Sequence, residues 1–391
     1  MWRINAVNKA YKFRLYPNEK QKEYFAKTFG CTRFIYNRML ADKIKYYEEN
    51  KKTLPNTPAQ YKKEFEWLKE VDSLALANAQ LNLQTAYKNF FIKQNKFPKY
   101  KSKHNKQSYT TNNQGGNIRL TEDDKYIILP KIKEVKLVKH RDIKGTIKSV
   151  TISKNCANQY FISVLTECEE PQKLTNNKNM VGIDLGIKEF AVLSSGEKIE
   201  NPKFLKKSLD KLKREQRKLS KCVKGSNNRV KQKVKVARTH NKVVNQRNDF
   251  LHKLSTRLIN ENQVICLETL KVKNMIKNHC LAQSIGDVSW SKFVGLLIYK
   301  AEWYGREVVQ IPTSYASSQT CSVCGYVNKE TKDLSVREWS CPNCKTHHDR
   351  DVNASINILH KGLEISGQEL SVEPVYAYDN GHIEQEAFCF S

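Results

Sequence analysis

Long apolar runs are missing from this chain, which argues against a membrane protein: no window approaches the roughly 20 uncharged apolar residues that a spanning helix needs. Behind Met1-Trp2-Arg3 the sequence also lacks the apolar segment of a secretory signal. Internal repeats and low-complexity tracts are absent as well. We therefore expect a cytoplasmic protein with no membrane partner.

Acidic residues are few relative to basic ones. The 391 residues include 68 Lys and Arg but 40 Asp and Glu, which gives a formal net charge of +28. A protein of this charge attracts polyanions from a distance, so nucleic acid is the expected partner. A ribosomal or membrane-surface protein without chemistry of its own is the alternative.

Half of this excess charge lies between residues 206 and 247, where 16 basic residues stand against 2 acidic ones. Apolar residues in this stretch keep roughly helical spacing on both sides of Gly225, which predicts an exposed basic helical hairpin at about residues 205–256. So many like charges repel one another unless a polyanion neutralises them. This favours a nucleic-acid contact over a merely solvated helical face.

The length predicts two or three domains, since a domain averages about 150 residues. Alternating apolar residues predict a strand at residues 9–15, and helical periodicity from Glu19, with a stop at Gly30, predicts a helical insertion over residues 18–95. Short strands between residues 118 and 165 predict a small antiparallel barrel. Further strands are expected at residues 180–192, 264–267 and 307–311, with helices at 250–258 and 293–303. This pattern is typical of a multidomain α/β protein.

Eleven cysteines are present, and four of them follow the spacing of a zinc ribbon. These are the Cys-x-x-Cys pairs Cys321 and Cys324, then Cys341 and Cys344. Four thiolates fill the tetrahedral positions of Zn²⁺, so we expect one structural zinc ion, with the residues between the pairs forming a β-hairpin. Reserve ligands follow at His347 and His348.

Three acidic residues stand where an apolar strand ends or a helix begins: Asp184, Glu268 and Asp351. Each alone has an ordinary explanation, as a turn residue, a solvated strand end or a helix N-cap. Together they suit two Mg²⁺ ions, because hard cations prefer oxygen ligands and an ion pair activates water for attack on a phosphodiester. Asp351 is preferred to Asp349 because it directly precedes the next helix. With the charge and the zinc motif, these acids predict a metal-dependent nuclease. Arg350 and Asn353 are candidates either for supporting these acids or for contacting phosphate.

The motifs around these residues have a recognisable form. They read Gly-Ile-Asp-Leu-Gly-Ile-Lys at Asp184, Leu-Glu-x-Leu at Glu268, Ser-Ser-Gln-Thr-Cys-Ser-x-Cys-Gly and Trp-Ser-Cys-Pro-x-Cys at the cysteines, and Asp-Arg-Asp-x-Asn-Ala at Asp351. Near the N-terminus stand Lys9-Ala-Tyr-Lys-Phe-Arg-Leu-Tyr-Pro, Phe29-Gly-Cys-Thr-Arg-Phe-Ile-Tyr-Asn-Arg, Lys88-Asn-Phe-Phe and Lys96-Phe-Pro-Lys-Tyr-Lys-Ser-Lys. From about residue 9 to 370, this set resembles the TnpB family, the transposon-associated relatives of the type V CRISPR effectors.

The resemblance implies an RNase H-like RuvC nuclease domain with an inserted zinc ribbon, and an N-terminal antiparallel wedge barrel that carries a helical recognition insert. Asp184, Glu268 and Asp351 are then the catalytic acids. The implied boundaries are residues 1–17 and 96–178 for the wedge, 18–95 for the recognition domain, 179–313 and 346–372 for the nuclease, 314–345 for the zinc ribbon and 373–391 for a mobile tail.

The helix expected at residues 73–87 is similar to the helix with which this family reads DNA, where many members carry a Gln pair. Ala77 and Asn78 stand in those places here, a departure that we expect to change the flanking motif recognised. Asn78, Thr111 and Asn112 are the candidate readers, since Asn and Thr side chains hydrogen-bond to base edges. Ordinary polar surface is the alternative.

By the same resemblance, the expected partners are a guide RNA derived from the transposon end and double-stranded target DNA. One protein monomer per RNA is expected, in the prokaryotic cytosol or nucleoid. The expected activity is metal-dependent cleavage of DNA that matches the guide, beside a short flanking motif. Two alternatives are a DNA-strand transferase that uses the same acids and a non-cleaving RNA-guided regulator.

Overall fold

The computed structural model describes residues 6–104, 106–333 and 335–367. By its internal contacts the chain divides into two units, one formed by Met1–Glu170 with Lys218–Arg238 and the other by Pro171–Arg217 with Thr239–Ser391. The tail predicted at residues 373–391 lies outside the described residues. Among the helices that are described, none combines the length and the apolar character needed to cross a membrane.

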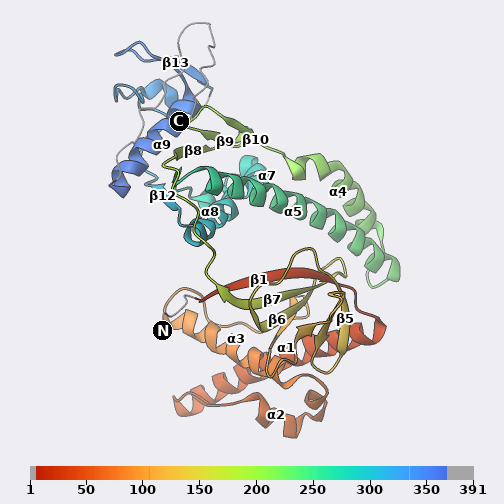
Figure 1. The fold of residues 1–391 in the computed structure, drawn as a ribbon. Helices are drawn as coiled ribbons and strands as arrows, with labels where there is room; N and C mark the ends of the chain where they lie inside the picture. The colour runs from red at the N-terminus through yellow and green to blue at the C-terminus, as the bar shows by residue number, and fades with distance from the viewer. Residues whose placement is uncertain (1–5, 105, 334, 368–391) are drawn as a thin grey trace, which may run out of the picture. The chain divides into compact units, whose positions relative to one another are not determined.

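A curled antiparallel sheet of seven strands is the centre of the first unit (Figure 1). Its order is β2-β6-β7-β1-β5-β4-β3, so β2 and β3 form the edges. Along β1 the side chains of Tyr11, Phe13 and Leu15 alternate into the core, which confirms the predicted period-two strand. The strand bounds are β1 Ala6–Leu15, β2 Gln107–Asn112, β3 Arg119–Leu120, β4 Tyr126–Leu129, β5 Lys133–Val138, β6 Thr146–Lys154 and β7 Tyr160–Glu169.

Between β1 and β2 the first unit is helical. The helices here are α1 Glu19–Asn50, α2 Pro58–Glu64, the 3-10 helix η1 Glu66–Glu70 and α3 Ser73–Phe91. The predicted helix stop at Gly30 is wrong, because α1 continues through it. An internal glycine costs about 1 kcal/mol, and burial of the neighbouring Phe29 and Cys31 offsets that cost. The helix begins at Asn18, which forms a capping box with Gln21.

A five-stranded sheet of mixed direction is the centre of the second unit, in the order β10-β9-β8-β11-β12. The bounds are β8 Met180–Leu185, β9 Glu189–Leu193, β10 Lys198–Glu200, β11 Val264–Glu268 and β12 Glu307–Ile311. These confirm the strands predicted at residues 180–192, 264–267 and 307–311, whereas β10 was not predicted. β8 is antiparallel to β9 and parallel to β11, and β11 is parallel to β12. Because Ile183 is level with Leu267, the carboxyl ends of the parallel strands β8 and β11 lie side by side at one end of the sheet.

The helix α9, Arg350–Ser366, lies close against this sheet and packs on β8, β11 and β12. Two glycines permit the close approach. A Cβ at Gly182 of β8 would lie 2.0 Å from Ser355 O, and a Cβ at Gly362 of α9 would lie 2.3 Å from Cys266 Sγ. The last described helix is therefore held directly against the two parallel strands that precede it by long stretches of sequence.

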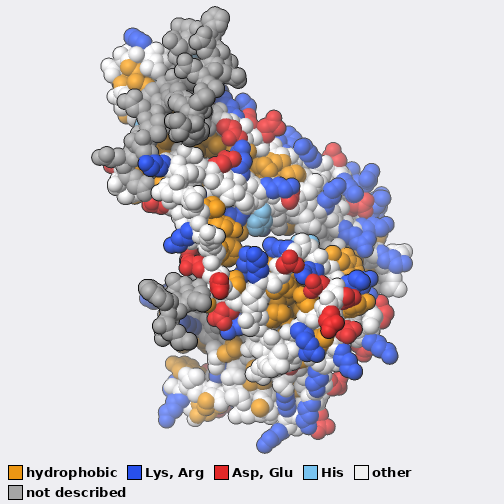
Figure 2. Space-filling model, viewed as in Figure 1, with side chains coloured by type: hydrophobic (Ala, Val, Ile, Leu, Met, Phe, Trp, Pro, Cys, Tyr) orange, Lys and Arg blue, Asp and Glu red, His pale blue; other side chains and the backbone are white. Residues whose placement is uncertain are grey.

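The predicted basic hairpin is formed by α4 Phe204–Lys221 and α5 Asn227–Glu261, between β10 and β11 in the sequence. The guanidinium of Arg229 ties its turn by donating to Leu219 O at 2.8 Å and to Cys222 O at 3.1 Å. Lys and Arg side chains gather over both helices (Figure 2). The helix predicted at residues 250–258 is the last part of α5 rather than a separate element.

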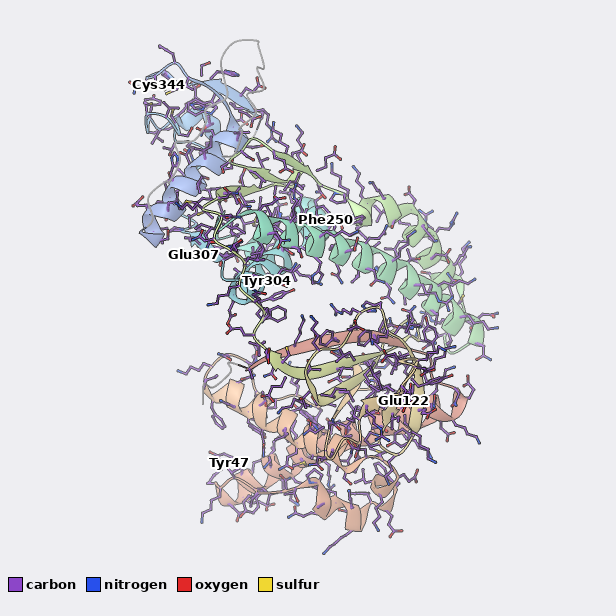
Figure 3. The ribbon with its side chains drawn as sticks, viewed as in Figure 1. Tyr47, Glu122, Phe250, Tyr304, Glu307 and Cys344 are labelled. Carbon is purple, nitrogen blue, oxygen red and sulfur yellow. The ribbon has the colours of Figure 1, made fainter. Side chains whose placement is uncertain are left out.

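Aromatic packing fixes the end of α5 to the sheet. Phe250 lies on α5 (Figure 3). Its ring meets that of Phe190 of β9 edge to face with the centroids 5.0 Å apart, and Phe190 meets Phe293 in the same way at 5.1 Å. Arg247 of α5 also pairs with Asp287 at 2.7 Å. The helices that follow β11 are α6 Val272–Met275, α7 His279–Val288 and α8 Trp290–Tyr304, of which α7 carries Asp287 and α8 carries Phe293.

Candidate functional site

Two of the three predicted acids lie at the carboxyl ends of neighbouring parallel strands. Asp184 is the fifth residue of β8, and Glu268 is the last residue of β11. Because Ile183 is level with Leu267, the two carboxylates follow at the same level of the sheet. Both residues are largely buried there, with a minor part of their surface exposed. The strand pairing thus brings together two acids that are far apart in the sequence.

The third acid, Asp351, lies in the first turn of α9, where Asp349 is the N-cap. Asp349 Oδ1 accepts hydrogen bonds from the backbone N–H groups of Asp351 and Val352, both at 3.0 Å. Asp351 therefore lies inside the helix rather than at the predicted position directly before it, and the alternative that it is the N-cap is wrong. Asp349 also pairs with Lys198 at 2.6 Å, whereas Asp351 is partly exposed, with Arg337 Nη1 3.4 Å from its carboxylate.

The three acids act on one another electrostatically. Burial, followed by the negative charges of Glu268 and Asp351, raises the pKa of Asp184 to about 8, and the nearby Arg350 guanidinium opposes the rise. Within the described residues these carboxylates do not form a group whose ligand atoms all lie within 4.8 Å of one another. A carboxylate whose charge is destabilised by two neighbouring carboxylates nevertheless belongs to a donor set that suits hard divalent cations such as Mg²⁺, because the cation neutralises the negative charges.

Glu268 is held by a residue that the sequence did not single out. Ser317 Oγ donates a hydrogen bond to Glu268 Oε1 at 2.6 Å, and Ser317 is 4 % exposed. Asn357 of α9 fastens the loop around Ser317, since its Nδ2 donates to Ser317 O at 2.8 Å and to Thr320 O at 2.5 Å. The available signal was the position of Ser317 in the Ser-Ser-Gln-Thr-Cys motif.

Asn353 completes this network. Its Nδ2 donates to Thr320 O at 2.7 Å, and its Oδ1 accepts from Ser322 N at 2.9 Å. Asn353 is 1 % exposed and its side chain holds the loop, which favours the supporting role predicted for it over the alternative of a phosphate contact. Arg350 is also buried and donates to two backbone carbonyls between the cysteine pairs. The helix that carries Asp351 therefore also positions the loop that contacts Glu268 and leads into the first cysteine pair.

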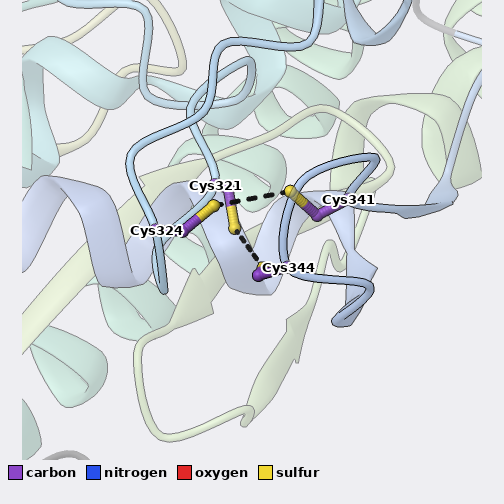
Figure 4. A group of neighbouring side chains, drawn as sticks. All are labelled: Cys321, Cys324, Cys341 and Cys344. Atoms are coloured by element: carbon purple, nitrogen blue, oxygen red, sulfur yellow. Dashed lines mark hydrogen bonds between the residues drawn. The ribbon is translucent and has the colours of Figure 1, made fainter.

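The four predicted cysteines converge into one cluster, with all four sulfur atoms within 4.8 Å of one another (Figure 4). Cys321 Sγ lies 3.7 Å from Cys344 Sγ, and Cys324 Sγ lies 3.6 Å from Cys341 Sγ. Thiolates at 2.3 Å from a tetrahedral Zn²⁺ would be about 3.8 Å apart. The residue types and the spacing both fit a structural zinc ion.

The two cysteine pairs lie in the same kind of tight turn. Gly325 N donates to Cys321 O at 2.9 Å, and Lys345 N donates to Cys341 O at 2.9 Å. Gly325 and Lys345 both have left-handed backbone conformations, with φ of 75° and 61°. The two turns bring the four sulfur atoms together from two separate segments, as a zinc ribbon requires.

The hairpin predicted between the two pairs is wrong. β13 Glu338–Ser340 pairs with β14 His347–Asp349, so these strands flank the second pair. The intervening segment forms η2 Lys329–Lys332, because the side chain of Asn328 caps a helical turn there. His348, one of the reserve ligands, is buried with its Nε2 3.1 Å from Cys321 Sγ, whereas His347 is exposed.

A groove of about 560 Å³ between α1, α3 and β2 contains one of the predicted base readers, Asn78. Asn112 lies beside it, with 3.4 Å between Asn78 Nδ2 and Asn112 Oδ1. Thr111 is 1 % exposed, and its hydroxyl donates to Asp72, the N-cap of α3. A direct contact between Thr111 and a base therefore requires Thr111 to leave the core. The groove is also lined by Arg33, Asn82, Lys106 and Gln107.

Three family models match parts of the chain. A model described as "Probable transposase" matches residues 163–279, one described as "Cas12f1-like, TNB domain" matches residues 290–358, and one described as "Helix-turn-helix domain" matches residues 1–52. The described part of the last range forms β1 and the uninterrupted α1, rather than two helices joined by a turn.

Two relatives match over nearly their full length. A protein of Streptomyces pristinaespiralis named "Putative RNA-guided DNA endonuclease" is 39 % identical over 389 residues, which cover 95 % of this chain and 93 % of the relative. "Putative RNA-guided DNA endonuclease InsQ" of Escherichia coli (strain K12) is 34 % identical, covering 93 % of this chain and 97 % of the relative. Among solved structures, a chain of the "Cas12f1-sgRNA-target DNA complex" aligns with a TM-score of 0.59 at 13 % identity, over 90 % of this chain and 99 % of that one. This last likeness concerns the fold.

Proposed function

Because the chain belongs to the TnpB family, we propose that it is an RNA-guided endonuclease that cleaves double-stranded DNA matching its guide, beside a short flanking motif. The proposal rests on one observation: Asp184 and Glu268 lie side by side at the carboxyl ends of β8 and β11, and burial, the charge of Glu268 and the charge of Asp351 on α9 together raise the pKa of Asp184. The sheet order supports an RNase H-like RuvC domain, because two parallel strands are added to an antiparallel three-stranded meander.

The proposed chemistry is phosphodiester hydrolysis assisted by two Mg²⁺ ions. Bound Mg²⁺ supplies Lewis acidity that activates water and stabilises the leaving oxygen. Asp184, Glu268 and Asp351 are the residues that hold the ions, and each has its own support. Asp184 extends from a buried strand, Glu268 accepts the hydrogen bond from Ser317, and Asp351 lies in the first helical turn, where the helix dipole stabilises a negative charge.

We further propose the domain assignment implied by the motifs. It comprises a wedge at residues 1–17 and 96–178, a recognition insert at 18–95, a nuclease domain at 179–313 and 346–372, and a zinc ribbon at 314–345 with one structural Zn²⁺ on its four cysteines. One protein monomer binds one guide RNA. The basic hairpin, α4 and α5, holds the phosphate backbones of the guide–target duplex, since a guided nuclease recognises that duplex by shape and charge.

Asn78 and Asn112 are the proposed readers of the flanking motif, because their amides adjoin one another and Asn78 lines an open groove. Thr111 contributes indirectly, by holding the Asp72 carboxylate that caps α3. Replacing Asn78 with Gln, the residue that many family members carry, should change the preferred flanking motif and leave RNA binding intact. Sequencing of the cleaved members of a plasmid library measures this preference.

The test of the proposed function is cleavage of a plasmid library that matches RNA recovered with the purified protein. Cleavage should require Mg²⁺, the RNA match and Asp184, and should disappear with EDTA or in Asp184→Ala. Glu302→Gln is the matched control, because it removes an exposed carboxylate from α8 in the same unit. A discrete bound RNA without any metal-dependent cutting would instead identify a guided regulator.

A strand transferase is the second candidate, favoured by the "Probable transposase" model at residues 163–279. Metal-activated attack by a 3′-hydroxyl needs the same acids as attack by water. The two activities separate in one assay, because a transferase joins labelled DNA ends to the plasmid whereas a nuclease leaves free ends.

A further inference from the structure

A cluster of aromatic rings at the end of α3 has no part in the function proposed above. Tyr87, Phe90, Phe91 and Phe97 contact one another with ring-centroid distances from 5.3 to 6.3 Å, and we name this cluster the aromatic patch. Phe91 is 72 % exposed and Phe97 is 44 % exposed. Large apolar side chains that gather at a surface mark a contact with another molecule.

The backbone holds the aromatic patch in shape. Asn89 O accepts hydrogen bonds at 2.9 and 3.0 Å from two N–H groups beyond the helix end, which turns the chain back and places Phe97 against the other rings. After this turn the backbone N–H of Lys101 donates to Asn37 Oδ1 of α1 at 2.7 Å. Tyr87 packs against the core between α1 and α3. Hydrogen bonds therefore hold the turn that carries the exposed rings.

The charge of this segment is entirely positive. Between Asp72 and Glu122 the sequence contains eight Lys and Arg and no acidic residue. Lys88, Lys93 and Lys96 belong to the patch's own segment and are exposed. Aromatic rings among lysines fit a single-stranded nucleic acid, because unpaired bases stack on the rings while the phosphates attract the cations.

We propose that the aromatic patch stacks unpaired bases of the guide RNA. This inference rests on the proposed function, since it requires a resident RNA. A second copy of the chain fits poorly, because a symmetric contact would bring the same lysines together. A displaced DNA strand is present only while the target is bound. Apolar rings this exposed promote association between protein molecules unless another molecule covers them at all times. A permanently bound RNA provides that cover.

The experiment compares variants of the full-length protein for binding of the labelled guide RNA over a range of salt concentrations. Phe91→Ala and Phe97→Ala should each weaken binding by roughly 5- to 100-fold, the effect of losing one stacked base. The slope of log affinity against log salt should not change, because no phosphate contact is lost. Lys88→Ala should instead lower that slope, and Phe91→Trp should keep full affinity. Leu81→Ala is the matched control, since Leu81 is an apolar residue of α3 that is 51 % exposed.

Three results would overturn the inference. Unchanged RNA affinity with reduced DNA cleavage by the preassembled complex would assign the patch to the displaced strand. Unchanged affinity with loss of a dimer in sedimentation would assign it to a second copy. Unchanged affinity with neither effect would leave the patch without a ligand. If the unaltered protein binds no discrete RNA, the proposed function itself fails, so the two failures are distinguishable. Thermal melting checks that each variant is folded.

Discussion

Replacing Gly182 with alanine tests whether the contact between α9 and the sheet assembles the acidic site. A Cβ at this position would lie 2.0 Å from Ser355 O and 2.7 Å from Leu359 N. Both are backbone atoms of α9, so no side-chain rotation relieves the overlap. To restore ordinary contact the helix must move away from β8 by roughly 1 Å or more.

Overpacking of this kind costs about 1 to 3 kcal/mol, and we expect the upper end because the clash is between backbones. For a unit of this size each kcal/mol lowers Tm by about 2 to 4 °C, so the variant should melt roughly 6 to 12 °C lower. Because α9 also carries Asp351, a shift of about 1 Å should slow cleavage by roughly 100-fold even where the variant is folded.

The assay combines thermal unfolding, followed by circular dichroism, with guided DNA cleavage well below the melting temperature. Gly295→Ala is the control, because Gly295 is exposed in α8 and a Cβ there meets nothing within 4 Å. That change should stabilise the protein by up to about 1 kcal/mol. A Gly182→Ala variant that melts and cleaves like its parent would refute the tight contact, and one that melts lower but cleaves normally would refute the link to the site.

Ser317→Ala removes the hydrogen bond to Glu268, and a hydrogen bond to a charged group contributes about 1.5 to 3 kcal/mol. We therefore expect cleavage to slow by roughly 10- to 100-fold and the Mg²⁺ concentration for half-maximal rate to rise. Ser317→Thr keeps the hydroxyl and should restore the cleavage rate and the Mg²⁺ requirement. Cys341→Ser should lose zinc in metal analysis and lower Tm, and an unchanged zinc content would contradict the four-cysteine site. Burial lowers the pKa of Lys300 from 10.5 to about 8. Below about pH 8 the buried ammonium is charged and lowers the free energy of unfolding by the full cost of its burial. This cost disappears as the pH rises from about 8 towards 10.5, because the folded protein then loses the proton. Lys300 Nζ also donates hydrogen bonds to His252 O, Ser255 Oγ and Thr256 Oγ1, so Lys300→Met removes these bonds together with the buried charge. The stability of Lys300→Met relative to its parent should therefore fall between about pH 7 and about pH 9.5 in urea titrations, and a difference that is independent of pH would exclude the burial explanation.

The sequence predicted strands well where one face, or both, is buried. Residues 9–15 and 307–311 are examples, because alternation or a short apolar run records the burial directly. It predicted helix ends less well. Gly30 is a local stop signal, but packing on both sides of it carries α1 onward, and the apolar residues near Phe250 belong to the same helix as the basic segment before them.

The cysteine cluster could be predicted because each pair is local and a tetrahedral ion allows few arrangements. The meeting of the acids could not be derived from spacing. It depends on the pairing of β8 with β11 and on the docking of α9, both of which join distant segments; the sequence predicted a joint role for the acids from their chemistry, and the family resemblance agreed with it. Ser317 escaped notice because a serine in a loop acquires its partner, Glu268, through the fold alone.

The position of α9 near the end of the described chain has a consequence for synthesis. Ribosomes add about 5 to 20 residues per second, so a nascent chain that already contains Glu268 waits roughly 4 to 17 s for Asp351. The basic hairpin is made before either of these acids. A message broken or frameshifted ahead of α9 would therefore yield a product that carries the cationic hairpin but lacks Asp351. If the hairpin holds the guide–target duplex and Asp351 binds Mg²⁺, as proposed, such a fragment would compete with intact protein for the same RNA without cutting DNA, and damaged copies of the gene would restrain the intact one.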